Sequence, residues 1–256
     1  MLMHVEAAMM DTNANTDEQQ MRVDLAACYR LIALYGWDDL VFTHISARVP
    51  GPDEHFLINP YGMLFEEIAA SSLVKVDLAG NKVVDSPYPI NPAGFVIHSA
   101  VHEAREDVVC VLHTHTKAGI AVSAQADGLM PVSQTSLFPY ATLAYHDYEG
   151  IALNDDEKPR LVADLGNNNA LILRNHGLLT TGTSIADAFL MMYLLETACQ
   201  IQVMAQSAGG PLRPVPQPIV DGIQAQAAEV TKGLGGQLIW PGLLRKLDRM
   251  DPSYRD

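Results

Sequence analysis

The sequence predicts an α/β protein in which a mixed sheet is covered by helices. Apolar residues recur at helical spacing in some segments and alternate with polar residues in others, and the two patterns take turns along the chain. Strand pairs separated by turn residues interrupt the helices, so we do not expect a strict strand–helix series with a parallel sheet. With 256 residues, 48% of them hydrophobic, the chain can fill the core of one large domain.

The N-terminal part is predicted to contain a helix followed by a hairpin. Residues 1–16 show no apolar periodicity, so we expect a flexible N-terminal tail. Across residues 17–34 the apolar positions have helical spacing, and Gly36 marks the end of that helix. Strand-like patterns follow at 41–49 and 55–60, and the turn between them is rich in proline and glycine.

The next segments predict a second antiparallel pair and another helix. Residues 73–76 and 82–84 flank a Gly-Asn turn signal, which is typical of a hairpin. Asn91 can cap a helix and Pro92 suits its first position. We therefore expect a helix from there to about Arg105.

The second half of the chain is predicted to place strands between helices. The expected strands are 108–115, a segment around Val132, 142–146 and 170–174. The expected helices are 117–125, 154–168 and a long helix that runs from a cap at Thr183 or Ser184 to about Gln206. A turn is expected at 180–182.

The C-terminal segment, 209–256, is predicted to be a linker and a helical tail that follow a main domain at 17–208. Residues 209–218 are rich in proline and glycine, which is typical of a linker. Beyond them, residues such as Leu243 and Leu247 form one apolar helix face. That face should dock either on the core of its own chain or across a subunit boundary.

Composition argues against two classes of partner. The net charge of −14 and the pI near 4.9 are unlike those of proteins that bind phosphate backbones, so we expect no nucleic acid. We find no apolar run of 18 residues and no signal-peptide pattern, so we expect no membrane association. Cys28, Cys110 and Cys199 lie far apart in apolar segments, as core residues of a cytoplasmic protein do.

Two histidines at the end of one predicted strand are the first candidate for a metal site. His113 and His115 are two residues apart, and alternate side chains of a strand point to the same face. Two imidazoles from one strand end can therefore reach one cation. Catalytic zinc takes three protein ligands and keeps one position open. His176, which ends another apolar run, is the best third candidate.

The order of motifs resembles that of the class II aldolase/adducin family over roughly residues 20–208, and within it the adducin-like bacterial branch. The segments that carry the resemblance are Leu34-Tyr-Gly-Trp-Asp38, Thr43-His-Ile-Ser-Ala-Arg48, Asn59-Pro-Tyr-Gly62, Asn91-Pro-Ala-Gly-Phe95, His113-Thr-His115 and Asn175-His-Gly177.

This resemblance implies a three-layer α/β/α sandwich with a mixed, largely antiparallel sheet. It also implies a divalent metal ion held by His113, His115 and His176. Zinc is the expected ion, with manganese and iron as alternatives. A ring-shaped homotetramer with sites at the subunit interfaces is implied as well.

The chain departs from the sugar-phosphate aldolases of that family at the residues for proton transfer and phosphate binding. Gly94 stands where those enzymes carry an acid/base glutamate, and Thr43-His44 stands in place of a Gly-Asn phosphate motif. A phosphorylated sugar is therefore not the expected substrate. His44 is our first alternative for the base, because imidazole titrates near neutral pH, and Tyr61 is the second.

We therefore predict a metal-dependent lyase, an aldolase or a decarboxylase, for a small non-phosphorylated carbonyl or carboxylate compound. Two alternatives stay open: a non-catalytic interaction protein like the adducin head domain, and an iron-dependent oxygenase that uses the same three histidines. His98 and His102 also share one helix face, but no glutamate follows His98 as in His-Glu-x-x-His zinc sites. We expect these two histidines to pack beside the sheet.

Overall fold

The computed structural model describes residues 2–151 and 155–256, and within them one sheet has the strand order β3-β2-β1-β4-β7-β6-β5. Neighbouring strands are antiparallel except β5 and β6, which are parallel. The strands are β1 (His44–Arg48), β2 (His55–Ile58), β3 (Val74–Asp77), β4 (Cys110–Thr114), β5 (Leu143–His146), β6 (Ala170–Leu173) and β7 (Gly177–Gly182). The predicted mixed, largely antiparallel sheet is confirmed.

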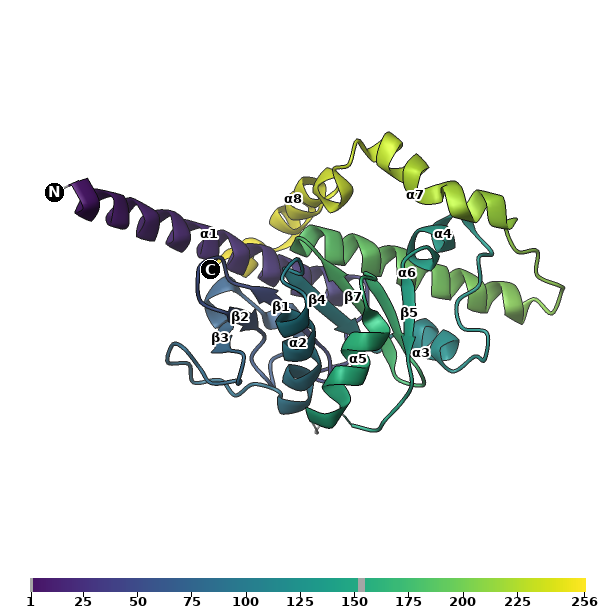
Figure 1. Cartoon of the computed structure of the whole chain (residues 1–256), viewed down its shortest axis with the longest axis horizontal. Coiled ribbons are helices and arrows are strands. Elements are labelled where there is room, and N and C mark those ends of the chain that lie inside the picture. Colours follow the sequence, from purple (N-terminus) through teal and green to yellow (C-terminus); the bar gives the residue numbers. More distant parts are fainter. Residues whose placement is uncertain (1, 152–154) are drawn as a thin grey trace.

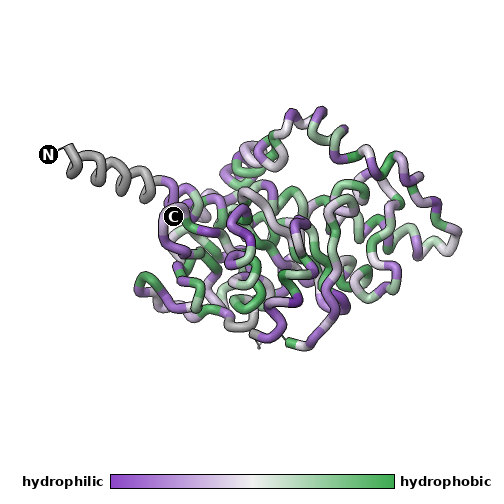
Figure 2. Tube along the Cα trace, viewed as in Figure 1, coloured by the Kyte–Doolittle hydropathy of each residue, from purple (hydrophilic) through white to green (hydrophobic). Residues whose placement is uncertain are grey.

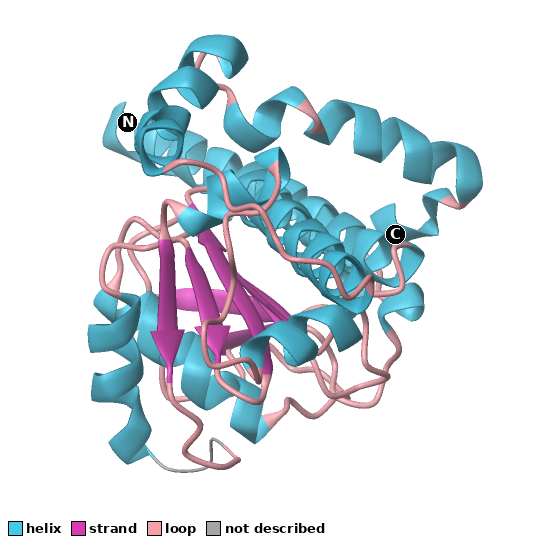
Figure 3. Cartoon of the chain, turned by 90° about the vertical axis from the view of Figure 1, so that its right-hand side faces the viewer, coloured by secondary structure: helices cyan, strands magenta, loops and turns pink. Residues whose placement is uncertain are grey.

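Helices cover both faces of the sheet, which confirms the three-layer α/β/α sandwich (Figures 1 and 3). One face carries α2 and α5, and the other carries α1, α3 and α6. The helices are α1 (Leu2–Leu34), α2 (Pro92–Ala104), α3 (Lys117–Ser123), α4 (Gln134–Tyr140), α5 (Lys158–Leu165), α6 (Ile185–Ser207), α7 (Gln217–Thr231) and α8 (Trp240–Met250). Short 3-10 helices lie at Phe65–Glu67, Ala70–Ser72, Asp155–Glu157, Gly235–Leu238 and Pro252–Arg255.

Alternation along the central strands assigns their side chains to two of the four buried hydrophobic clusters that the described residues form. In β4, Cys110 and Leu112 join the larger cluster beneath α1 and α6, whereas Val111 joins the cluster beneath α2 and α5. In β1, Ile45 and Ala47 likewise belong to the larger cluster. Because side chains alternate, His44, Ser46 and His113 lie on the α2 face of the sheet. Figure 2 shows hydrophobic residues running through the central strands.

Several predicted elements differ from the observed ones. Helix α1 begins at Leu2 and not at residue 17 (Figure 1). Once the packed part of the helix has formed, adding further residues at its N-terminal end is easier than starting a new helix, so those residues need no apolar periodicity of their own. The expected turn at 180–182 lies within β7, whose residues are all buried between β4 and β6. The division into tail, main domain and C-terminal segment stays a prediction.

Three smaller differences concern predicted strands and one helix start. Residues 82–84 form only a single bridge, Val76 to Lys82, on the outer edge of β3 that β2 leaves open. The segment around Val132 is a loop before α4. The helix predicted from residue 154 has its start outside the described residues, and α5 begins at Lys158.

The hairpin of β1 with β2, the helix after Asn91 and the cap of α6 are confirmed. Ser184 caps α6, its Oγ accepting a hydrogen bond from the backbone N–H of Asp187 at 3.1 Å. The three cysteines are buried and unpaired, as expected of core residues.

Helix α6 is the one described helix whose length and apolar composition would suffice to cross a membrane. Our reading of the sequence found no such stretch. In the fold α6 packs against β7, α3 and α4. Its apolar composition is therefore that of a core helix, which buries most of its surface.

The C-terminal helix α8 docks on its own chain. Trp240 and Leu247 are buried in the larger core cluster. The indole Nε1–H of Trp240 donates a hydrogen bond to Oδ1 of Asp24 in α1 at 2.8 Å. Of the two docking modes left open by the sequence, packing within the chain is thus the one observed.

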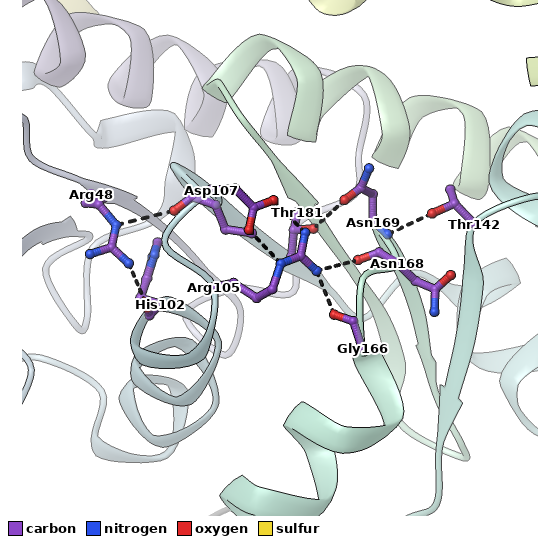
Figure 4. Close-up of polar contacts among 10 residues, drawn as sticks. Arg48, His102, Arg105, Asp107, Thr142, Gly166, Asn168, Asn169 and Thr181 are labelled. Atoms are coloured by element: carbon purple, nitrogen blue, oxygen red, sulfur yellow. Dashed lines mark hydrogen bonds and ion pairs between the residues drawn. The ribbon is translucent and has the colours of Figure 1, made fainter.

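Arg105 ties the end of α2 to the end of α5 (Figure 4). Its guanidinium donates to the carbonyl of Gly166 at 2.7 Å and forms an ion pair with Asp107 at 2.7 Å. These contacts hold the loop that leads into β4, the strand that carries the first histidine pair.

Candidate metal centre

The three histidines predicted as ligands meet at one end of the sheet. His113 lies in β4 and His115 just beyond its end, and their Nε2 atoms are 2.8 Å apart. Ligand atoms of His113, His115 and His176 all lie within 4.8 Å of one another. The predicted set is therefore brought together.

His176 reaches the other two histidines because β6 and β7 are joined by a tight turn. Leu173 and Gly177 pair across that turn, and Asn175 has a left-handed φ of 56°. A Cβ on Gly177 would lie closer than 3.0 Å to the carbonyl oxygen of Thr114. Glycine thus lets the turn approach the end of β4, which explains the Asn-His-Gly sequence.

Hydrogen bonds set which nitrogen of each strand histidine is free. The Nδ1–H of His113 donates to the carbonyl of Leu178 at 2.9 Å, because a carbonyl oxygen can only accept. The Nδ1 of His115 lies 3.0 Å from Oδ2 of Asp39, and a carboxylate likewise accepts. Carboxylate–histidine pairs of this kind orient metal ligands.

The two facing Nε2 atoms fit a bound cation. In neutral rings with protonated Nδ1, both Nε2 atoms carry lone pairs, which repel each other at 2.8 Å. Burial and the neighbouring histidines lower the pKa of His113, and burial followed by His115 lowers the pKa of His176 to about 4. Neutral rings are the form that binds a metal ion, so the donor set fits a divalent ion.

The histidines open into a cavity of about 490 Å³ with largely apolar walls. Phe42, Tyr148 and Ile151 are exposed at its mouth. The lining residues are Asp39, Phe42, His44, Tyr61, Asn91, Gly94, Ile97, His113, His115, Tyr148, Gly150, Ile151 and His176. Among these described residues there is no lysine or arginine.

Both candidate bases line the same cavity. Tyr61 is exposed, whereas His44 is buried at the start of β1 and pairs in register with His113. A Cβ on Gly94 would lie closer than 3.0 Å to three atoms of the His44 ring. The imidazole of His44 thus fills the space in front of Gly94, the position at which the sugar-phosphate aldolases of the resemblance carry a glutamate.

The sequence reading missed two partners of the site. Asp39, in the loop between α1 and β1, was not singled out although it follows the Trp37-Asp38 motif directly. His98 was expected to pack beside the sheet, and it is buried there, but it also forms a hydrogen bond with His44 at 2.7 Å. A strand histidine and a helix histidine far apart in sequence give no local signal of such a bond.

Comparisons with known proteins agree with this geometry. Residues 23–203 match the model of the Class II Aldolase and Adducin N-terminal domain. A class 2 aldolase-like protein of Pseudomonas aeruginosa is 62% identical over 255 residues, covering 98% of each chain. Alpha-adducin of Mus musculus is 48% identical over 199 residues, which cover 76% of this chain and 27% of that protein.

Solved structures match the whole fold. The crystal structure of an aldolase II superfamily protein from Pseudomonas syringae has a TM-score of 0.88 and 53% identity, and the match covers 94% of this chain and 96% of that one. An L-fuculose 1-phosphate aldolase from Glaciozyma antarctica has a TM-score of 0.79 and 29% identity, with 95% and 94% covered. The chain described here belongs to the class II aldolase and adducin family.

Proposed function

We propose that the protein is a metal-dependent lyase that acts on a small, non-phosphorylated carbonyl or carboxylate compound by aldol cleavage or decarboxylation. The observation that carries the proposal is the set of three convergent histidine nitrogens at the base of a cavity. Three protein ligands leave a coordination position for a substrate oxygen. Zinc is the proposed ion, and manganese and iron are the alternatives.

His113, His115 and His176 would hold the ion. When bound, a divalent ion polarises a substrate oxygen and stabilises the negative charge that both reactions develop. Asp39 orients His115, and the carbonyl of Leu178 orients His113.

His44 is the proposed group for proton transfer, and Tyr61 is the alternative. His44 lies in the cavity wall, in front of Gly94 and beside His113, with ring centroids 5.3 Å apart. In aldol cleavage His44 would take the proton of a substrate hydroxyl. Decarboxylation removes no proton from carbon, so the proton that the product carbon gains would come from water, and His44 would relay it.

The walls of the cavity support a non-phosphorylated substrate. Phosphate-binding sites commonly use arginine or lysine. The start of α2 reaches the wall at Asn91 and Gly94, but no lysine or arginine is among the described lining residues. Arg48 and Arg174 are directed elsewhere, since they donate to the carbonyls of His102 and Gln125. Apolar side chains such as Phe42 and Ile97 suit a compact organic body.

A non-catalytic role is the second candidate, and the identity with alpha-adducin favours it. Metal content separates the lyase, the non-catalytic protein and the iron-dependent oxygenase. Zinc or manganese bound at about one ion per chain would support the lyase, iron would support oxygen chemistry, and no metal after reconstitution would support the interaction protein.

Metal analysis by mass spectrometry of the full chain is the test. We expect that His113→Ala and His176→Ala each remove the ion, while His146→Gln, a buried histidine paired with Asp164, retains it. The metal-loaded protein is then assayed for carbon dioxide or aldehyde release from hydroxy and keto acids. The His44→Gln variant should keep the metal and lose turnover; if turnover is unchanged, His44 is not the base.

We also propose a cytoplasmic homotetramer. The three buried, unpaired thiols suit a reducing compartment, and the exposed apolar residues at the mouth of the cavity suit contact with a second copy. Light scattering of the purified full chain measures the mass, and a monomer at micromolar concentration would contradict this assembly.

A further inference from the structure

A continuous line of buried polar side chains leads away from the cavity. The Nδ1 of His44 lies 2.7 Å from Nε2 of His98, and the Nδ1 of His98 lies 2.7 Å from Oγ of Ser46. The same Oγ lies 2.8 Å from Nε2 of His102. All four residues are at most 4% exposed.

Two sequence periods create this line. His44 and Ser46 are two residues apart on β1 and share its α2 face, while His98 and His102 are four apart on α2 and share the face toward the sheet. The side chains therefore alternate between strand and helix. The far end is held by Phe56, which stacks on His102 with ring centroids 4.4 Å apart, and by Arg48, which donates to the carbonyl of His102 (Figure 4).

Hydrogen-bond chemistry favours two arrangements of this line. A neutral imidazole has one N–H and one acceptor nitrogen, and a hydroxyl has one hydrogen to donate and can accept two. If Ser46 accepted from both His98 and His102, its buried hydroxyl hydrogen would lack a partner in the line, which is costly for a buried donor. When Ser46 donates within the line, all three rings are protonated on Nδ1 or all three on Nε2. Burial lowers the pKa of all three histidines, that of His102 to about 3, so the rings are neutral.

The far end of the line favours one of the two arrangements. Nε2 of His102 faces Ser46, so Nδ1 is the nitrogen left to face the backbone beyond. This Nδ1 is buried and has no hydrogen-bond partner among the described atoms. Burial lowers the pKa of the ring, and the backbone of Val108 opposes this larger effect by raising it, as a carbonyl beside a ring N–H does. A proton on Nδ1 of His102 sets the direction of every bond up to the cavity.

We propose that His98, Ser46 and His102 are positioning residues that hold His44 in the tautomer protonated on Nδ1. In this arrangement His44 donates to His98, His98 donates to Ser46, and Ser46 donates to His102. Nε2 of His44, the nitrogen beside Gly94, then presents a lone pair to the cavity. The tautomer of His44 is inferred independently of the proposed function. The use of its lone pair as the proton acceptor rests on that function.

The test is a nitrogen NMR measurement of histidine tautomers in the full chain labelled with ¹⁵N-histidine, before and after addition of zinc. Single-histidine variants assign the signals. We expect His44, His98 and His102 to be protonated on Nδ1, with a ratio of the two tautomers of about 10 to 1 or more at His44. A wild-type spectrum with His44 protonated on Nε2 would overturn the proposal, and this measurement requires no buried substitution to fold.

Ser46→Ala tests the coupling along the line. It removes the hydroxyl between His98 and His102, so the tautomer ratio of His44 should fall to within about threefold of unity. The matched control, His146→Gln, removes a buried histidine of a separate network and should leave His44 unchanged. An unaltered His44 ratio in Ser46→Ala, or in His98→Gln if that variant folds better, refutes the coupling. Absence of zinc binding or turnover in the wild type would refute the proposed function and leave the tautomer result standing.

Discussion

Gly94 is predicted to be a helix glycine at which alanine destabilises the protein. Alanine ordinarily stabilises a helix relative to glycine, by up to about 1 kcal/mol. At position 94 the added Cβ would overlap the ring of His44 and push it away from His98, to which it is hydrogen-bonded at 2.7 Å. Two opposing effects therefore decide the sign of the change in stability.

The structure lets the two effects be compared. Overpacking a filled site costs about 1–3 kcal/mol. Breaking the bond between His44 and His98 leaves a buried nitrogen without a partner, which costs about another 1–3 kcal/mol. After subtraction of the helix gain, Gly94→Ala should lower the free energy of unfolding by about 1–5 kcal/mol. In a chain of this size that is a fall of roughly 3–20 °C in Tm.

Urea and thermal unfolding measure the effect. Gly242→Ala is the matched control, because Gly242 is also the third residue of its helix and a Cβ there meets only ordinary contacts. It should be neutral or stabilising. In a His44→Ala background the overlap is absent, so Gly94→Ala should cost little, and the coupling in the double-mutant cycle should be about 2 kcal/mol. The reasoning fails if Gly94→Ala stabilises the parent protein, or destabilises both backgrounds equally.

Three further predictions concern the metal centre and its surroundings. Asp39→Ala should weaken zinc binding about 10–100-fold by calorimetry, because His115 loses the acceptor that orients it, while the stability of the metal-free protein changes little; equal zinc affinity would contradict that role. Chelation of the metal should lower the Tm of the parent but not of His176→Ala, since a ligand that binds only the folded state stabilises it. The pKa of His102 is lowered to about 3 in the fold against about 6.5 unfolded, so its stabilising contribution is present above pH 6.5 and lost as the pH falls toward 3. Between pH 7.5 and pH 5 the parent should lose about 2 kcal/mol more than His102→Gln in urea unfolding, and parallel losses would refute this assignment.

Local patterns in the sequence were sufficient to predict a mixed sheet covered by helices and to select three candidate histidines. The period of apolar residues identified β1, β2, β4, β6 and the long helix α6, because each element buries one face or both. The pair His113 and His115 was recognisable because two ligands of one strand end follow a fixed spacing. His176 was recognisable as the end of a second apolar run before glycine.

The sequence was less informative where the structure of a segment depends on the strands beside it and not on its own pattern of apolar residues. Residues 180–182 resemble a turn by composition, yet they complete β7 because β4 and β6 pair with both edges. Residues 82–84 resemble a strand, but they form only one bridge to the outer edge of β3, which remains the edge strand of the sheet.

The sequence determined a mixed sheet covered by helices through its periods, and an α/β/α core with three histidines at one site through its resemblance to a known family. Only the tertiary structure decided what surrounds them. Asp39 reaches His115 across 76 residues, and His44 reaches His98 across 54. Such contacts depend on how β1, β4 and α2 are placed relative to one another. In the sequence, Gly94 indicates only that the acid/base glutamate is absent. In the fold, the missing side chain at position 94 leaves the space that the ring of His44 occupies.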